Sequence, residues 1–287
     1  MYNVYDKIIN NPDRYRQFSY GESLSAIVQC STDKKLADLW SHHNYIMYVT
    51  QGRKIWYTAH GSYELQKGSC VMVRKGANIV EHFFDTSFCF ILFFITDEFI
   101  YEVLKSKTKS INKAGKKFEP VIPIDNTPNV EAFFQSMIPH FTSTYEPDQS
   151  LIELKFRELI LTIADNPNNA ELLSYFYSLM KEPQSVSLQR IMDENYCYNL
   201  KLNEYAQMSN RSLSAFKRDF QKQFNSSPGK WLLEKRLNYA MHLLDKMDKT
   251  VSETAFESGF ENPAHFSRSF KERFGIVPSA VRRTQAA

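Results

Sequence analysis

Two stretches near the carboxyl end of the chain carry polar and cationic side chains at matching positions. The first stretch offers Ser214, Lys217, Arg218 and Gln221. The second offers Ala264, His265, Ser267, Arg268 and Lys271. Hydroxyl, amide, ammonium and guanidinium groups of this kind donate hydrogen bonds to phosphate oxygens and to base edges in a major groove. A solvated helix face would explain any single residue, but the repeated arginine favours contact with nucleic acid.

An internal duplication accounts for the matching arginines. When the chain is aligned with itself at an offset of 50 residues, similar residue types coincide throughout residues 200–287. The coinciding pairs are Ser212 with Asn262, Phe216 with Phe266, Arg218 with Arg268, Phe220 with Phe270, Phe224 with Phe274 and Pro228 with Pro278. Two copies of one structural unit are the economical explanation.

Each copy contains the signals of a capped helix about three turns long. Ser212 and Asn262 can accept hydrogen bonds from exposed N–H groups of the following turn, and Pro263 occupies the favoured first helical position. Phenylalanines follow each cap at intervals of four residues and form one apolar stripe that must face a core. A proline four residues beyond the last phenylalanine ends each helix. The polar and cationic side chains are therefore expected to point outward.

A shorter apolar helix precedes each cap and ends in a tight turn. The first contains Ala206 and is followed by Asn210, and the second contains Ala255 and is followed by Gly259. Alanine allows the next helix to approach closely, and Asn and Gly tolerate the left-handed conformation that ends a helix. The sequence therefore predicts two helix-turn-helix units.

A single long helix is expected between the two units, from Pro228 to about Lys246. Its apolar side is formed by Trp231, Leu232, Leu237, Ala240, Leu243 and Leu244. About 17 residues at the α-helical rise span roughly 25 Å. A spacer of this length could hold two recognition helices about 34 Å apart, near one turn of DNA.

This carboxyl-terminal region resembles the AraC/XylS-type DNA-binding domain over about Leu188 to Arg283. The residues that carry the resemblance are Ala206, Ser212, Phe220, Pro228, Arg236, Ala240, Leu244, Ala255, Gly259-Phe260, Phe266-Ser-Arg, Phe270-Lys and Phe274-Gly with Pro278. The resemblance implies groove-reading roles for Ser214, Lys217 and Arg218 and for His265, Ser267 and Arg268. It also implies a structural or phosphate-facing role for Arg236. The first unit departs from the pattern at Asn210, Asn225 and Asp219.

The amino-terminal half has the texture of a β-barrel followed by helices. Short runs rich in β-branched and aromatic residues alternate with glycine-containing turns from about Leu24 to Ile95. The expected strands are Tyr45–Val49, Lys54–Thr58, Tyr63–Leu65, Cys70–Val73 and Phe88–Ile95. The expected helices are Asp97–Leu104, Val130–Phe141, Gln149–Ala164 and Ala170–Met180. This half is similar to the cupin-like effector domain found ahead of many AraC-type DNA-binding domains, and the pattern around Val73 looks like the type III secretion regulators.

One expected helix carries an apolar stripe that has two explanations. The stripe consists of Ile152, Phe156, Leu159 and Ile163. It could pack on the barrel or pair with the same helix of a second subunit, and periodicity alone does not distinguish a core from an interface.

A metal-dependent barrel enzyme is disfavoured, because a divalent ion needs several converging ligands and the chain has no His-x-His motif. The nearby candidates are His42, His43, His60, Glu81 and His82, for which surface or core positions are the simpler explanation. We therefore expect no metal, no cofactor and no enzymatic activity. The effector, a small molecule or a protein, is not identified by the sequence.

Composition places the chain among ordinary globular proteins. Its 43% hydrophobic content over 287 residues can bury the cores of two domains. The longest apolar run, Phe88 to Ile95, is too short to span a bilayer, and no signal peptide opens the chain, so a cytoplasmic location is expected. Four scattered cysteines, Cys30, Cys70, Cys89 and Cys197, suggest reduced thiols. Residues 184–287 carry 16 Lys and Arg against 11 Asp and Glu, a net charge of +5.

The expected fold is of the α+β class, with a cupin-like β-barrel, a helical subdomain and an all-α double helix-turn-helix domain. The expected boundaries are 1–96 for the barrel, 97–183 for the helical and dimerisation subdomain, and 184–287 for the DNA-binding domain. Within the last, the first unit covers about 200–224, the linker helix about 229–246 and the second unit about 250–275.

The expected function is that of a transcription activator that binds promoter DNA as a homodimer, with RNA polymerase as a partner. The alternatives are a cupin-type metal enzyme with a DNA-binding tail, which would hold a tightly bound metal, and a barrel module that mainly recruits another protein.

Overall fold

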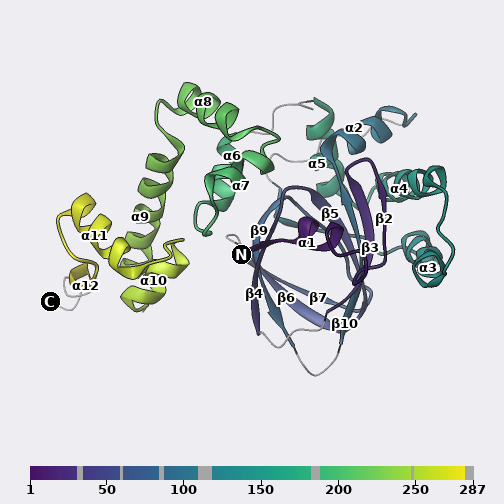
Figure 1. Ribbon diagram of the computed structural model, residues 1–287, viewed down its shortest axis with the longest axis horizontal. Helices are drawn as coiled ribbons and strands as arrows, with labels where there is room; N and C mark the ends of the chain where they lie inside the picture. The colour runs from purple at the N-terminus through teal and green to yellow at the C-terminus, as the bar shows by residue number, and fades with distance from the viewer. Residues whose placement is uncertain are drawn as a thin grey trace. The chain divides into compact units, whose positions relative to one another are not determined.

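The computed structural model describes residues 1–30, 35–58, 61–83, 87–108, 118–181, 188–246 and 249–281. The chain divides into two compact units, Met1–Ser185 and Val186–Ala287 (Figure 1). The first combines strands and helices, and the described part of the second is helical, so the fold is α+β as the sequence predicts.

Two sheets face each other in the amino-terminal unit. One has the strand order β1 (Tyr2–Asn3), β4 (Leu36–Ser41), β9 (Gly76–His82), β6 (Arg53–Thr58), β7 (Gly61–Gln66). The other has the order β11 (Val121–Ile124), β8 (Cys70–Val73), β5 (Asn44–Gln51), β10 (Phe88–Ile95), β3 (Ser23–Cys30), β2 (Gln17–Tyr20). Among the described strands, every pairing is antiparallel except β1 with β4. The two sheets form the predicted barrel.

The six-stranded sheet is buried on both faces, and the alternation of side chains along its strands shows why. In β10, Phe90, Leu92 and Phe94 belong to the core between the sheets. Ile91 and Phe93 belong to a second core under the helices. Because successive side chains of a strand point to opposite faces, a strand with two buried faces must be apolar throughout. This explains the continuous apolar run of β10.

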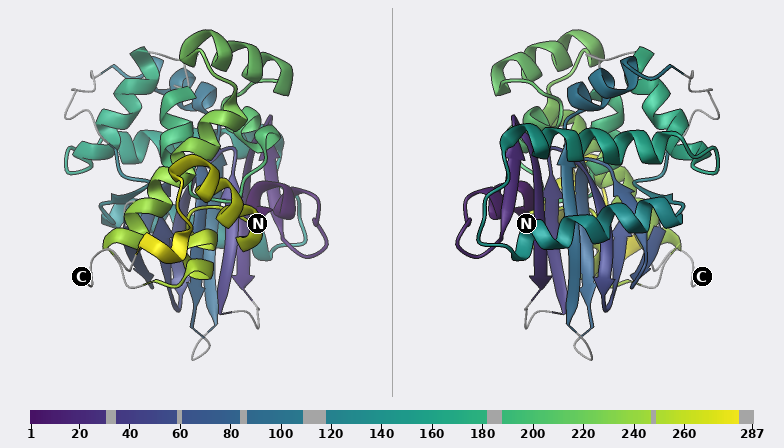
Figure 2. Two further views of the ribbon diagram at one scale, coloured as in Figure 1. Left: turned by 90° about the vertical axis from the view of Figure 1, so that its left-hand side faces the viewer. Right: turned by 90° about the vertical axis from the view of Figure 1, so that its right-hand side faces the viewer.

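Helices cover the outer face of this sheet (Figure 2, right). The helices of the unit are α1 (Val4–Ile9), α2 (Asp97–Lys105), α3 (Pro128–Thr142), α4 (Gln149–Ala164) and α5 (Ala170–Lys181). Thr96, Thr127 and Asp148 cap α2, α3 and α4 by accepting backbone N–H groups of the first turn. The four helices α2 to α5 agree with the helices expected from sequence to within two residues.

A buried polar network joins the six-stranded sheet to two of these helices. Lys75 Nζ lies 2.7 Å from Asp97 Oδ2, and each side chain is 5% exposed. Asn44 donates to the other carboxylate oxygen of Asp97, and Tyr175 on α5 donates to the Asn44 side-chain oxygen. Removal of one partner would leave a charge buried without its counter-ion, which is strongly destabilising.

The helical subdomain expected over residues 97–183 is not purely helical. Val121–Ile124 forms β11, which pairs with β8 and extends the six-stranded sheet beyond residue 96. Pro123 conceals this strand in the sequence because proline cannot donate to a ladder of hydrogen bonds. Position at the sheet edge makes the missing donor tolerable. Barrel and helices therefore form one unit rather than two domains.

The apolar stripe of α4 packs inside the chain. Ile152, Phe156, Leu159 and Ile163 are 0–3% exposed and lie in the core that α4 shares with the sheet. These four side chains are not available to a second subunit, which corrects their designation as dimerisation candidates. Three other leucines of α4 are exposed, namely Leu151, Leu154 and Leu161.

The carboxyl-terminal unit is a chain of seven helices over its described residues. They are α6 (Leu188–Asn195), α7 (Leu202–Met208), α8 (Leu213–Phe224), α9 (Pro228–Lys246), α10 (Val251–Glu257), α11 (Pro263–Phe274) and α12 (Pro278–Val281). The long helix α9 runs between α6–α8 and α10–α12 (Figure 1). Its 19 residues agree with the expected linker helix.

Among the described residues, no helix combines the length and the apolar character needed to cross a bilayer.

Candidate nucleic-acid interface

The first helix-turn-helix unit consists of α7, a tight turn and α8. Asn210 has a positive φ of 53°, which places the turn in the left-handed region. The next residue, Arg211, donates its backbone N–H to the carbonyl of Ala206 at 2.9 Å and so closes the end of α7. The Ser212 hydroxyl then accepts from the backbone N–H of Ala215 at 3.2 Å and starts α8.

The second unit repeats this arrangement with α10 and α11. Gly259 has a φ of 86°, and Phe260 donates its N–H to the carbonyl of Ala255 at 2.9 Å. The Asn262 side chain accepts from the N–H groups of Ala264 and His265 and starts α11. Both predicted cap residues are therefore caps in the structure.

Phenylalanines anchor each recognition helix to its own core. Phe216 and Phe220 on α8 and Phe266 and Phe270 on α11 are all 0% exposed. Their rings contact one another and the linker helix, with Phe220 6.0 Å from Trp231 between ring centroids. Burial of this stripe orients each helix about its axis, so that the opposite side faces outward.

The outward side carries the groups that the sequence analysis singled out. The exposed side chains are Ser214, Lys217, Arg218 and Gln221 on α8 and His265, Arg268 and Lys271 on α11, and Ser267 is partly exposed. The His265 ring also lies against Phe260, with 5.8 Å between centroids. The fold thus gathers both predicted sets on the solvent sides of two capped helices.

The turns of the two units differ by one residue. Only Arg211 separates Asn210 from its helix cap, whereas Phe260 and Glu261 separate Gly259 from its cap. Phe260 is 4% exposed and contributes to the core of its unit. In the first unit the structurally equivalent position, whose N–H bonds to the alanine carbonyl, holds a charged arginine.

A carboxylate on α8 pairs with this arginine. Asp219 Oδ2 lies 3.2 Å from Arg211 Nε, and Asp219 Oδ1 lies 3.2 Å from Arg218 Nε. Partial burial raises the pKa of Asp219, but hydrogen bonds from Arg211 and Arg218 outweigh this and hold the pKa below its usual value. Asp219 stands out in the sequence as a departure from the family pattern, whereas Arg211 does not stand out. Their spacing of eight residues across a turn gives no periodic signal.

The long helix α9 holds Arg236 against the loop between α6 and α7. The guanidinium donates to the carbonyls of Tyr196 at 2.7 Å and Tyr198 at 2.6 Å. Gly259 lies next to it: a Cβ at this position would stand 2.9 Å from Arg236 Nε and 3.0 Å from the carbonyl oxygen of Cys197. These contacts favour the structural role of Arg236 over the phosphate-facing one.

The candidate metal ligands of the barrel do not converge. His42 Nδ1 bonds to the Asn3 amide, and Glu81 pairs with Lys35 and Tyr57. His82 is 8% exposed and lines a small cavity between the sheets. No group of three His, Cys, Asp or Glu side chains suited to a metal occurs among the described residues, and His60 lies outside them.

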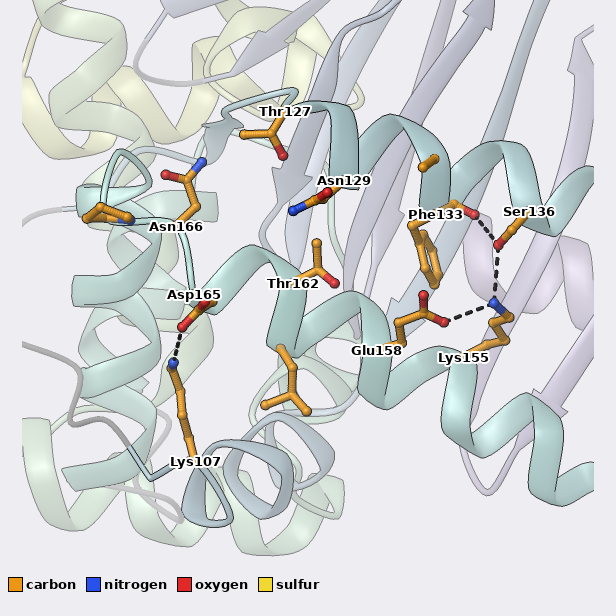
Figure 3. A pocket seen from close by; sticks show the side chains of 13 residues that line it. Lys107, Thr127, Asn129, Phe133, Ser136, Lys155, Glu158, Thr162, Asp165 and Asn166 are labelled. Carbon is orange, nitrogen blue, oxygen red and sulfur yellow. Dashed lines mark hydrogen bonds and ion pairs between the residues drawn. The ribbon is translucent and has the colours of Figure 1, made fainter.

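A groove of about 830 Å³ lies between α3 and α4 (Figure 3). Its charged side chains pair with one another: Lys107 with Asp165 at 3.0 Å, and Lys155 with Glu158 at 2.9 Å. Positive and negative groups thus balance along the groove, and it offers no concentration of one charge.

Two helix-turn-helix units with exposed polar faces define a DNA-binding protein. Comparison with known families agrees with this class. The model of the ExsA N-terminal regulatory domain matches residues 44–175, and a helix-turn-helix domain model matches residues 205–284.

Among curated proteins, the virulence regulon transcriptional activator VirF of Yersinia enterocolitica is 26% identical over 83% of this chain and 89% of its own length. The transcriptional regulator ExsA of Pseudomonas aeruginosa is 31% identical over 48% of this chain and 50% of its own length. An apo variant of ToxT from Vibrio cholerae aligns over 91% of this chain and 97% of its own, with 14% identity and a TM-score of 0.43.

The chain is an AraC/XylS-type transcription regulator. It joins an ExsA-type regulatory domain to an AraC-type helix-turn-helix domain. Both resemblances that the sequence analysis stated, for the carboxyl-terminal and the amino-terminal half, are confirmed.

Proposed function

We propose that this regulator recognises specific promoter sequences by inserting α8 and α11 into two successive major grooves. One observation carries the proposal: both helices bury their phenylalanines and present an arginine at the same position after the cap, Arg218 and Arg268. An exposed guanidinium on the groove-facing side of a recognition helix can donate two hydrogen bonds to a guanine.

The other outward side chains have distinct proposed roles. Lys217 and Lys271 neutralise phosphates, which raises affinity for any sequence. Gln221 can pair with an adenine edge, whereas Ser214, His265 and Ser267 are short groups that reach bases or phosphates. Ser212 and Asn262 fix the ends of the helices that enter the grooves.

Activation is the proposed outcome of DNA binding. VirF, which shares 26% of residues over most of its length, is named as a transcriptional activator. We extend this role to the present chain, with promoter DNA as its target and RNA polymerase as its partner. We place this activity in the cytoplasm and propose that the amino-terminal unit regulates it.

A homodimer is also part of the proposal. The outer side of α4 exposes three leucines, and Leu154 is 61% exposed. Leu154 and Leu161 lie opposite the buried stripe of α4, and Leu151 lies to one side of it. We propose that these leucines, which flank the charged residues Arg157 and Glu158, pair with the same face of a second copy.

Substitution of Arg268 tests the DNA-binding proposal. The wild-type chain is first used to map bound sites across the genome of its host, and a strongly bound fragment serves as the probe. Arg268→Ala should weaken binding to this fragment by about fivefold to about 150-fold at fixed salt, because a bidentate contact to guanine contributes roughly 1–3 kcal/mol.

Lys105→Ala is the charge-matched control, because it removes an exposed cation from α2 of the amino-terminal unit. Its affinity should equal that of the wild type. An Arg268→Ala chain that folds and binds the fragment as tightly as the wild type would contradict the proposal.

A further inference from the structure

Asp219 forms a bridge between the turn and the outward face of α8. One carboxylate oxygen accepts from Arg211 and the other from Arg218, both at 3.2 Å from Nε. Arg211 is itself fixed to the turn, because its Nη1 donates to the carbonyl of Ser209 at 2.8 Å. A chain of three contacts therefore connects the backbone of the turn to the Arg218 guanidinium.

Stability does not explain the contact between Asp219 and Arg218. The Arg218 side chain is 76% exposed, and exposed ion pairs contribute little to folding. Arg218 and Asp219 are also neighbours in the chain, and adjacent residues of a helix do not face each other. The contact therefore draws the Arg218 side chain sideways from the direction it would otherwise take.

The contact with Asp219 leaves the terminal Nη groups of Arg218 available for DNA. Arg218 contacts Asp219 through Nε, and both terminal Nη groups remain to donate. A guanine presents N7 and O6 as a pair of acceptors on its major-groove edge, which two such groups can match. A guanidinium held through Nε loses less side-chain freedom when it binds this edge.

We propose that Asp219 is a specificity-determining residue of the first unit. Asp219 holds Arg218 in the orientation that selects guanine, and Arg211 anchors Asp219 to the turn. The inference rests on the proposed function, since it assumes that α8 enters a major groove. Asp219 acts through Arg218 and is a positioning residue. Its negative charge also opposes phosphate contact by Arg218, so it lowers affinity for unrelated sequences.

The second unit has no equivalent of the Asp219 bridge among its described residues. Ser269 stands where α8 has Asp219, and it is 8% exposed and lies 3.5 Å from His265 Nε2. The turn position that holds Arg211 is occupied by the buried Phe260. Within the described residues, Arg268 makes no ion pair. The two units are therefore expected to depend on different residues for their base preference.

Selection from a library of duplex DNA with a randomised centre tests the inference. The full-length wild type, Arg218→Ala, Arg268→Ala and Asp219→Ala are each used to select bound sequences. Positions weakened by Arg218→Ala identify the part of the motif that the first unit reads, and those weakened by Arg268→Ala identify the part that the second unit reads.

Asp219→Ala should lose the guanine preference of the first part and keep the second part unchanged. The ratio of affinities for the wild-type motif and for a random duplex should fall about fivefold to tenfold. The released Arg218 can contact a phosphate, so binding to the random duplex should become steeper in salt by up to about 0.9 in the log–log slope. A merely structural role would produce neither change.

Further variants sharpen the test. Asp219→Asn keeps the size of the side chain and one oxygen acceptor, so it should retain part of the guanine preference. In an Arg218→Ala chain, Asp219→Ala should cause no further loss of the ratio. Glu272→Gln, which removes an exposed carboxylate from α11, is the charge control and should leave the ratio unchanged.

Two results would overturn the inference. The first is that Asp219→Ala and Asp219→Asn both select the wild-type motif with the wild-type affinity ratio. The second is that Asp219→Ala weakens both parts of the motif equally. Failure of the wild type to select any motif would instead overturn the proposed function.

Discussion

At the scale of single residues, Gly259 fixes the turn of the second unit in two ways. Its backbone is left-handed, and its missing side chain leaves room for Arg236 and for the carbonyl of Cys197. The first requirement can be met by asparagine, as Asn210 shows in the first unit. The second cannot, because any Cβ at residue 259 meets a backbone oxygen at 3.0 Å.

Gly259→Ala is therefore expected to lower the free energy of unfolding of the carboxyl-terminal unit by about 1–3 kcal/mol. Urea unfolding followed by circular dichroism measures the change. Gly229→Ala is the matched control, because Gly229 lies in α9 with no atom within 4 Å of its added Cβ. It should be neutral or stabilising by up to about 1 kcal/mol. Equal stabilities of the two variants would exclude the close approach as a cause.

At the scale of helices and strands, local signals predicted the carboxyl-terminal unit closely. Caps, apolar spacing and terminal prolines act within a few residues, so Ser212 and Asn262 could be recognised without knowledge of the rest of the fold. The short strand β11 could not be recognised in this way, because it forms only by pairing with a sheet edge that is distant in the sequence. Nor could periodicity decide what covers the apolar stripe of α4.

Because the predicted stripe of α4 is buried, we propose the exposed leucines of this helix as the dimer surface. Leu154→Lys places a charge on the exposed leucine face and should convert a homodimer into a monomer, because a buried and unpaired charge at an interface is costly. Sedimentation velocity distinguishes the two states.

Leu36→Lys makes the same change at a leucine of β4 that is 54% exposed, and it should leave the dimer intact. If the wild type is monomeric at all concentrations tested, or if Leu154→Lys dimerises like the wild type, this part of the proposal is incorrect.

At the scale of the whole molecule, the two units differ in the sign of their net charge. The net charge of +5 over residues 184–287 belongs to the DNA-binding part, and the rest of the chain carries a net charge of −2. Composition could indicate this division but not the contact between Arg211 and Asp219, which depends on the conformation of a turn. The same limit applies to His82 of the amino-terminal unit, whose pKa depends on its burial and on nearby lysines.

Burial, with nearby Lys54 and Lys7, lowers the pKa of His82 to about 4, well below the value of about 6.5 in an unfolded chain. Below about pH 6.5 the unfolded chain binds a proton that the folded chain does not bind. Stability should therefore fall as the pH is lowered from about 6.5 towards about 4, by up to about 1.4 kcal/mol per pH unit for this histidine.

His82→Phe keeps an aromatic ring but cannot be protonated, so its stability should decline less steeply over the same pH range. Urea unfolding at a series of pH values compares the two chains. His42→Gln, at a half-buried ring near the edge of the barrel, provides a second histidine variant for comparison. Parallel pH profiles for the wild type and His82→Phe would show that His82 does not contribute to the acid sensitivity.

The double burial of β10 has a mechanical consequence for a regulatory domain. The neighbouring residues Leu92 and Phe93 belong to two separate hydrophobic cores. Leu92 lies in the core inside the barrel, and Phe93 lies in the core beneath α3 and α4. Close packing transmits displacement, so a rearrangement that pushes on one side of this partition must shift the other. The interior of the barrel and the exposed leucines of α4 are thus connected through the thickness of a single strand.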